Sequence, residues 1–496
     1  MQFDRRAGVF LHVTSLPGPH GIGDLGQNAR RFLDWLADAE QSYWQFCPLG
    51  PTAPVHGDSP YQAYSAFAGN PLLVNLERLV DAGYLDREDL EPIPDFSDHD
   101  VEYDRVREYK TERLRTAAER FHADADTAER DAFEAFRERE STWLDDYALF
   151  MALRTRYDGA WTDWPEPVRT RDPDAIAEHR ESLADEIAYR TFVQFVFDRQ
   201  WRAVREYAHE RGIDLVGDLP IYVALDSADV WANPEAFDLT DDGRPATVAG
   251  VPPNPGDDGQ RWGNPVYDWE SLRADDYGWW VARLERLFDL ADVTRIDHFK
   301  GFDEFWAIPT DADAPAEGEW RDAPGHDFFE TLAGRFGDLP FIVEDLGFVD
   351  QGLVDLRDRF GFPSMRVPHY ADWCQQGDMY QPMHYPDNSV GYTATHDTDT
   401  VVGYYESLSA EQRSCLEYNI GADGSEINWS LIEAVWRSDA VLAFTTLQDV
   451  LGLDSHARFN EPGTTHGNWT WRATAAAFDD DLADRLARVT DEHIRN

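Results

Sequence analysis

The sequence predicts an α/β protein built as a (β/α)₈ barrel, on three observations. Short apolar stretches that are partly β-branched alternate with helical patterns along most of the chain, as in parallel β/α units. Several of these stretches end in an acidic residue, which is typical of the carboxyl-terminal face of a barrel enzyme. The chain of 496 residues is 42% hydrophobic, enough for one barrel with insertions.

The order of the elements supports this fold. Helical patterns at 29–39, 189–210, 279–290, 327–336 and 353–360 separate most of the expected strands. The expected strands are residues 9–13, 43–49, 213–223, 293–296, 341–343, 365–367, 392–397 and 443–446.

Two stretches do not fit the alternation and are predicted as insertions into a single domain, 1–496. Residues from about 72 to 190 carry long charged amphipathic patterns at 103–121 and 132–157, so we expect a mainly helical insertion. Residues from about 226 to 275 are expected to form a loop insertion near the site. Within it, 248–262 is rich in Pro, Gly and Asp and predicts a loop.

The net charge of the chain indicates the environment in which the protein works and excludes some classes of partner. The formal net charge is −51, with acids spread along the whole sequence. Self-repulsion of this size is a property of halophilic proteins, so we expect a salt-rich cytoplasm. The same charge argues against nucleic acid and against an anionic membrane as partners.

Cysteine usage and the N-terminus lead to the same expected compartment. Cys47, Cys374 and Cys415 are too few and too scattered for a disulfide framework or a zinc site, which favours a reducing compartment. No apolar run at the N-terminus reads as a signal peptide, and no window offers an uncharged membrane span. We therefore expect a cytoplasmic protein.

A glycine-rich stretch, Gly21-Ile22-Gly23-Asp24-Leu25-Gly26, formally matches the dinucleotide fingerprint G-x-G-x-x-G. That fingerprint needs its glycines directly at the end of a strand. Here Pro17 and Pro19 separate the expected strand from the glycines, so the match is weak.

The polar residues at three strand ends indicate chemistry. A single Asp after a strand is more often a helix N-cap than a catalyst, but Asp297, Glu344 and Asp397 follow three strands, two of them with an adjoining His or Arg. Paired carboxylates cleave glycosidic bonds, one ionised and one protonated. Glu344 follows apolar residues that would raise its pKa, whereas Asp297 lies two residues after Arg295 and is placed to stay charged.

A metal site is the rival interpretation of these residues, since His and Asp also bind Zn²⁺ or Fe²⁺. No H-E-x-x-H motif or regular Cys/His spacing supports a metal, so sugar chemistry is the better interpretation.

The chain resembles the 4-α-glucanotransferases of the amylomaltase type, glycoside hydrolase family 77, almost from end to end. The matching segments are Thr14–Pro19, Tyr43–Gln45, Gly57–Gln62, Ser65–Pro71, Gly217–Ile221, Val248–Pro253, Gly259–Pro265, Arg295–Phe299, Glu344–Gly347 and Thr395–Asp397. Their combination in this order is highly specific.

The resemblance implies a role for each site residue. Asp297 is expected to be the nucleophile, Glu344 the general acid/base and Asp397 the stabiliser of the transition state. The implied substrate-binding residues are Ser59, Tyr61, Asp218, Gln260, Trp262, Arg295, His298, His396 and Asn460, with Tyr61 stacking on the sugar and Gln260 and Trp262 on the acceptor side. The resemblance further implies no cofactor and no metal, with maltooligosaccharides and α-1,4-glucans as substrates.

Three positions depart from the family pattern. The loop after Pro253 reads Asn254-Pro255-Gly256-Asp257-Asp258 and lacks the usual Asp-Tyr-Phe run, which affects chain-length preference and cyclisation. Thr398 and Phe459 stand where Asn and Met are usual. Two alternatives to glucanotransfer stay open: a hydrolase on the same barrel, and a noncatalytic glucan-binding relative, against which the complete triad argues.

Overall fold

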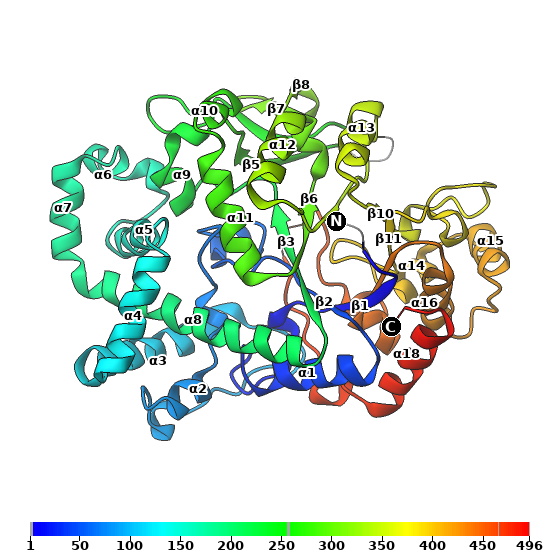
Figure 1. The fold of residues 1–496 in the computed structure, drawn as a ribbon, viewed down its shortest axis with the longest axis horizontal. Coiled ribbons are helices and arrows are strands. Elements are labelled where there is room, and N and C mark those ends of the chain that lie inside the picture. The colour runs from blue at the N-terminus through cyan, green and yellow to red at the C-terminus, as the bar shows by residue number, and fades with distance from the viewer. Residues whose placement is uncertain (1–2, 255–257, 465, 496) are drawn as a thin grey trace.

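A computed structural model describes residues 3–254, 258–464 and 466–495, and its centre is a closed barrel of parallel strands (Figure 1). Around the barrel the strands follow the order β1-β12-β11-β10-β9-β6-β3-β2. The barrel strands are β1 (Arg6–Phe10), β2 (Tyr43–Gln45), β3 (Asp214–Pro220), β6 (Val293–Asp297), β9 (Phe341–Val343), β10 (Ser364–Arg366), β11 (Ser389–Tyr392) and β12 (Leu442–Thr446). The predicted fold class is confirmed.

The strands form where short apolar runs can be buried on both faces, as parallel barrels require. Phe341–Val343 and Leu442–Thr446 are buried at every position. Several predicted boundaries are wrong. The first strand is Arg6–Phe10, not 9–13, and the strand predicted at 392–397 already ends at Tyr392. The strands predicted at 43–49 and 213–223 end early, at Gln45 and Pro220. Residues 393–397 therefore belong to the following loop, where a polar backbone is solvated or hydrogen-bonded locally.

Helices surround the barrel, and within the described residues none is both long and apolar enough to cross a membrane (Figure 1). Those that follow or flank barrel strands are α1 (Gln27–Asp38), α8 (Ala184–Glu210), α9 (Ala228–Ala232), α10 (Trp269–Ala274), α11 (Gly278–Leu290), α12 (Gly325–Phe336), α13 (Gln351–Phe360), α14 (Val401–Ser407), α15 (Ala410–Ile420), α16 (Ile427–Arg437), α17 (Leu447–Leu451) and α18 (Asp480–Glu492).

Between β2 and α8 the chain is helical and lies on one side of the barrel, at the left of Figure 1. It forms α2 (Leu76–Asp81), α3 (Tyr103–Asp124), α4 (Thr127–Arg139), α5 (Leu144–Arg156), α6 (Glu166–Arg169) and α7 (Pro173–Ser182). The prediction of one helix over 132–157 is wrong, because the chain turns between α4 and α5. The buried Glu140 holds that turn by accepting a 2.8 Å hydrogen bond from the indole nitrogen of Trp143.

A second sheet of four antiparallel strands, ordered β5-β4-β7-β8, lies beside the barrel at the top of Figure 1. Its strands are β4 (Thr247–Val251), β5 (Gln260–Pro265), β7 (Glu304–Pro309) and β8 (Glu319–Asp322). The prediction of a loop over 248–262 is therefore wrong at both ends, where 248–251 and 260–262 are strands, and 255–257 lie outside the described residues. The Pro and Gly content of this stretch obscured two strands, of which β4 pairs with β7, distant in sequence, and β5 pairs with β4.

The cysteine prediction also needs correction, because Cys374 and Cys415 form a disulfide. The two residues are 41 positions apart, one in the turns after β10 and the other in α15, and the fold brings their Cα atoms to 5.3 Å. Cys47 is buried and free. The expected reducing compartment therefore loses its support from cysteine usage.

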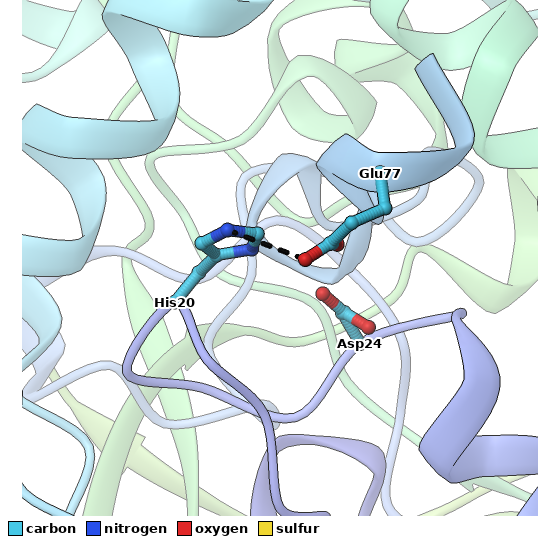
Figure 2. A group of neighbouring side chains, drawn as sticks. All are labelled: His20, Asp24 and Glu77. Atoms are coloured by element: carbon cyan, nitrogen blue, oxygen red, sulfur yellow. Dashed lines mark ion pairs between the residues drawn. The ribbon is translucent and has the colours of Figure 1, made fainter. Parts of the chain in front are cut away.

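The glycine-rich stretch 21–26 is a packed connection and no phosphate cradle. A Cβ on Gly23 would lie 2.0 Å from the carbonyl oxygen of Val13, so a side chain cannot fit there. Next to it, His20, Asp24 and Glu77 face one another (Figure 2), with the His20 ring nitrogen Nε2 3.6 Å from Glu77 Oε1. Two carboxylates at this point disfavour a phosphate, which agrees with the weak sequence match.

Candidate active site

The register between β3 and β6 creates the central ion pairs of the site. Asp218 is paired with Arg295 across these strands, and both side chains are buried. Arg295 Nη1 donates to both Asp218 carboxylate oxygens at 2.8 Å and to Asp297 Oδ1 at 2.9 Å. Burial raises the pKa of Asp218, against the opposing charge of Arg295. Arg295 thus holds two carboxylates at the carboxyl end of the barrel.

Glu344 directly follows β9 and lies next to β6. Its backbone N–H donates to Ile296 O at 3.0 Å, and its side-chain Oε2 accepts a 2.6 Å hydrogen bond from the backbone N–H of His298. Burial, followed by the negative charge of Asp297, raises the pKa of Glu344 to about 7. Glu344 can therefore carry or release a proton near neutral pH, as an acid/base must.

The hydrogen bond from the His298 backbone N–H to Glu344 depends on an unusual backbone conformation of His298. Its φ of 52° and ψ of 53° place it in the left-handed region, which is costly for a residue with a side chain. That conformation directs its N–H at Glu344, an example of strain at a site. Its ring packs edge-on against Trp262 with centroids 4.8 Å apart, and burial lowers the pKa of His298 to about 4. His298 is therefore neutral at pH 7.

The surroundings of Asp397 lower its pKa, whereas those of Glu344 raise the pKa of that group. Asp397 Oδ1 accepts a 2.6 Å hydrogen bond from Asn460 Nδ2, and Oδ2 lies 3.0 Å from His396 Nε2. Burial by itself would raise the pKa of Asp397, but His396 and Asn460 outweigh burial and lower it to about 2. The carboxylate in return raises the pKa of His396 against burial. Asp397 is thus ionised throughout the working pH range.

Tyr61 contacts both Asp218 and His396. Its hydroxyl donates to Asp218 Oδ2 at 2.9 Å, and its ring stacks on His396 with centroids 5.0 Å apart and planes at 18°. Ser59 supports the turn, since its Oγ accepts from the Tyr61 backbone N–H at 3.2 Å. A rigid aromatic face at this position is suited to packing on a sugar ring.

Gln260 and Trp262 reach the site from β5 of the second sheet. Trp262 Nε1 donates to Gln260 Oε1 at 2.9 Å, and the Trp262 ring contacts His298. The sheet is tied to the Tyr61 turn by a 2.8 Å hydrogen bond from Gln62 Nε2 to Asn264 Oδ1. The structure therefore brings every residue of the predicted site into one contiguous set of contacts.

Sequence reasoning missed two residues of this set. Arg458 Nη2 donates to the Asp397 carbonyl oxygen at 2.9 Å, and Arg458 Nε donates to Asn460 O at 2.8 Å. The ring of Trp469 lies 5.7 Å from that of Tyr61 and 6.1 Å from that of His396. Arg458 could have been suspected from its place two residues before Asn460, whereas nothing in the sequence near Trp469 signals the site.

The two milder departures from the family pattern are accommodated next to the site. Thr398 Oγ1 accepts from the Thr395 backbone N–H at 2.8 Å and so closes the turn that carries Asp397. Phe459 is 3% exposed and packs edge-on against Trp469 with centroids 5.3 Å apart. Of the altered loop, 255–257 lie outside the described residues.

Groups of His, Asp and Glu with metal-ligand spacing occur elsewhere in the described residues. They are His20-Asp24-Glu77, His209-Asp214-Asp292 and Asp303-Glu304-Asp350. Each has a cationic side chain facing its carboxylates: Lys110 lies 3.6 Å from Asp24, Arg205 2.6 Å from Asp292, and Lys300 2.6 Å from Asp350. None of these groups contains Asp297, Glu344 or Asp397.

Acidic side chains grouped at the carboxyl ends of parallel barrel strands, with an aromatic platform, define the class: a carbohydrate-active (β/α)₈ enzyme. Residues 11–477 match the family described as 4-alpha-glucanotransferase. The 4-alpha-glucanotransferase of Synechocystis sp. is 44% identical over 493 residues, covering 98% of this chain and 97% of that protein. That of Thermus thermophilus is 43% identical over 501 residues, covering 99% of each.

The solved structures agree. Amylomaltase from Streptococcus agalactiae in complex with acarbose superposes with a TM-score of 0.95 at 34% identity, covering 99% of this chain and 100% of that one. The chain belongs to the 4-alpha-glucanotransferase family.

Proposed function

We propose that this 4-alpha-glucanotransferase moves α-1,4-glucan segments between maltooligosaccharides by a retaining double displacement. The observation that carries the mechanism is the pair formed by Glu344, with a pKa raised to about 7, and Asp297, held by Arg295 at 2.9 Å. Retaining glycosidic chemistry needs one protonated and one ionised carboxyl group.

In the first step an Asp297 carboxylate oxygen attacks the anomeric carbon of the donor. The bond from that carbon to the leaving 4-oxygen breaks as Glu344 gives its proton to the leaving oxygen, and a glycosyl ester forms on Asp297. In the second step the 4-hydroxyl of an acceptor attacks the same carbon. Glu344 takes the hydroxyl proton back, and Asp297 leaves as a carboxylate.

The remaining site residues act on the sugar. Asp397, with its low pKa, supplies negative charge to the oxocarbenium-like transition state. Tyr61 offers a stacking face, and its contacts with Asp218 and His396 hold the ring in place. Gln260 and Trp262, on β5 of the second sheet, would contact the acceptor. That the related Streptococcus agalactiae amylomaltase is in complex with acarbose supports a glucan-like substrate.

The decisive test of the function is incubation of the purified protein with maltotriose, with the products resolved over time. Longer maltooligosaccharides appearing together with free glucose would establish transfer. Accumulation of glucose and maltose alone would identify a hydrolase, because water rather than a sugar hydroxyl would then resolve the intermediate. An unchanged substrate with the fold intact would leave only glucan binding.

The two proposed carboxyl roles can be tested by isosteric amides. Asp297→Asn removes the nucleophile and should lower kcat at least about 10³-fold. Glu344→Gln removes the proton donor and should lower it about 10²- to 10⁴-fold. Glu433→Gln, at an exposed position of α16, is the matched control and should retain full rate. Either site variant with near-normal turnover, its fold verified by circular dichroism, would refute the assignment.

We also propose that the protein works in a salt-rich cytoplasm. The net charge of −51 supports salt adaptation. The disulfide between Cys374 and Cys415 removes the argument from cysteine usage, so composition alone supports this compartment.

A further inference from the structure

The loop between β11 and α14, residues 393–400, carries Asp397, and we call it the Asp397 loop. Turns within the loop are closed by its own side chains. Thr398 Oγ1 accepts from the Thr395 backbone N–H at 2.8 Å, and Thr395 Oγ1 accepts from the Asp397 backbone N–H at 3.3 Å. These hydrogen bonds set the local shape of the loop. Its position relative to the other catalytic strands depends on contacts from outside the loop.

A single carboxylate holds both ends of the Asp397 loop. Asp449 Oδ2 accepts a 2.6 Å hydrogen bond from the hydroxyl of Thr393, the first residue of the loop. Asp449 Oδ1 accepts a 2.8 Å hydrogen bond from the backbone N–H of Val401, the residue directly after the loop. Hydrogen bonds to an ionised carboxylate are among the strong ones in proteins. The two oxygens of Asp449 therefore close the base of the loop.

The N-terminus of α17, the helix that contains Asp449, is capped by another residue. Asp449 is the third residue of α17, where an acidic side chain often turns back to cap the start of its own helix. Here Thr446 is the N-cap, and its Oγ1 accepts from the Asp449 backbone N–H at 3.1 Å. The Asp449 carboxylate instead accepts from Thr393 and Val401, which belong to the preceding β/α unit.

The carboxylate lies below the site and out of reach of a substrate. Asp449 is 0% exposed, and Thr393 and Val401 are equally buried. Burial raises the pKa of Asp449 to about 6, and the hydrogen bond from Thr393 opposes that rise, so the group is mainly ionised at pH 7. Loss of this carboxylate would leave the Val401 N–H buried without its acceptor, which is costly.

The chain that follows Asp449 contacts the same loop further along. In the turns after α17, Ser455 Oγ donates to Asp399 Oδ2 at 2.6 Å, and Arg458 Nη2 donates to the Asp397 carbonyl oxygen at 2.9 Å. One continuous stretch of chain thus holds the Asp397 loop at its base and near Asp397 itself. The contact at the base is the one that fixes both ends of the loop.

We propose that Asp449 is a positioning residue of the transfer reaction. It fixes the Asp397 loop on the barrel and thereby places the Asp397 carboxylate next to the reacting anomeric carbon. The inference deepens the proposed function and rests on it, since that function assigns Asp397 to the oxocarbenium-like transition state. Positive charge develops on the sugar only in the transition state, so a displaced Asp397 costs rate rather than substrate affinity.

The test is steady-state kinetics on maltotriose for variants of the clamp. Asp449→Leu keeps the approximate size of the side chain but accepts no hydrogen bond, so kcat should fall about 10²-fold while KM stays within about two-fold. Thr393→Val removes only one of the two bonds and should lower kcat about ten-fold. Asp449→Asn can still accept from Val401 and can donate to the Thr393 hydroxyl oxygen, so its kcat should stay within about five-fold of the parent value.

Thr445→Val is the matched control. Thr445 is as buried as Thr393, and its Oγ1 lies 3.0 Å from that of Thr393, but its hydroxyl is bonded to Thr393 rather than to Asp449. This variant should keep the parent kcat. A purely structural role of Asp449 would lower the melting temperatures of the variants but leave kcat per folded molecule unchanged, so rates are measured well below each melting temperature. Deuterium exchange of peptides spanning 393–403 should be faster in Asp449→Leu and Thr393→Val than in Thr445→Val.

The outcomes separate this role from the proposed function. A parental kcat in folded Asp449→Leu and in Thr393→Val, with transfer by the parent intact, would overturn only the role of Asp449. A rise in KM that accounts for the whole loss of kcat/KM would overturn it as well. Hydrolysis of maltotriose by the parent, with the same fall in kcat in the variants, would count against transfer and support the positioning role. A folded parent without any activity would overturn both proposals.

Discussion

Within one site, two carboxyl groups have pKa values that are shifted in opposite directions. Glu344 has a pKa of about 7 and receives one backbone N–H, whereas Asp397 has a pKa of about 2 and faces His396 and Asn460. Both are desolvated, so the difference comes from the partners. The apolar run before Glu344 predicted the first shift. The second comes first from His396, the preceding residue, and then from Asn460, whose contact across 63 residues of sequence could not be predicted locally.

The pKa of Glu344 predicts the alkaline limb of the activity profile. Its protonated form is needed for the first step, so kcat/KM on maltotriose should fall as pH rises through about 7, approaching ten-fold per unit. Asp397, with a pKa near 2, should contribute no change above pH 4. Initial rates from pH 5 to 9 test this, with circular dichroism at each pH to exclude unfolding. A flat profile up to pH 9 would contradict the proposed acid.

Among the elements, the segment after β6 is fixed to α13 by one lysine. Lys300, buried, places Nζ at 2.7 Å from Asp303, 3.1 Å from Glu304 and 2.6 Å from Asp350. Asp350 also caps α13 by accepting from the Leu353 backbone N–H at 3.0 Å. Lys300 thus links the segment that begins with Asp297 to the helix after the Glu344 strand.

Replacing this lysine should therefore affect both stability and rate. Lys300→Met keeps the stem but leaves three carboxylates without their cation, and should cost about 2 kcal/mol of unfolding free energy, since the acids are partly exposed. The value of kcat should fall more than KM rises, because Asp297 and Glu344 lose their relative placement. Lys300→Arg should recover most of both losses. Equal urea midpoints for Lys300→Met and the parent would disprove the clamp.

The disulfide also joins two elements, the turns after β10 and α15. Alkylation of the denatured, unreduced protein followed by mass spectrometry should label Cys47 alone, and reduction beforehand should expose Cys374 and Cys415 as well. Labelling of all of them without reduction would show that the thiols are free in the isolated protein.

For the whole molecule, charge is the dominant feature. A net charge of −51 opposes compaction, and arginine pairs such as Arg205 with Asp292 relieve it only locally. The melting temperature should therefore rise steadily with KCl, because the Debye length shrinks from about 10 Å at 0.1 M to about 3 Å at 1 M. Sucrose at equal osmolality is the control for solvent exclusion. The same melting temperature in dilute buffer and in molar KCl would rule out salt adaptation.

The fold class was predictable because barrel strands that are buried on both faces leave a local record of short apolar runs with polar ends. The second sheet was not, since β4 pairs with β7, which lies far along the chain, and β5 in turn pairs with β4. The bond between Cys374 and Cys415 likewise depends on contact between separate segments.

The site follows the same division. Asp297 and Glu344 stand at strand ends and Asp397 in the loop after β11, each in a short polar motif, so residue type and spacing in the sequence were enough to select them. Arg458 and Trp469 became part of the site only through folding, because their contacts with Asp397 and Tyr61 join loops from different β/α units. The type of each catalytic residue is visible in a short stretch of sequence. Its burial, and many of the partners that determine its pKa, arise only when distant segments pack together.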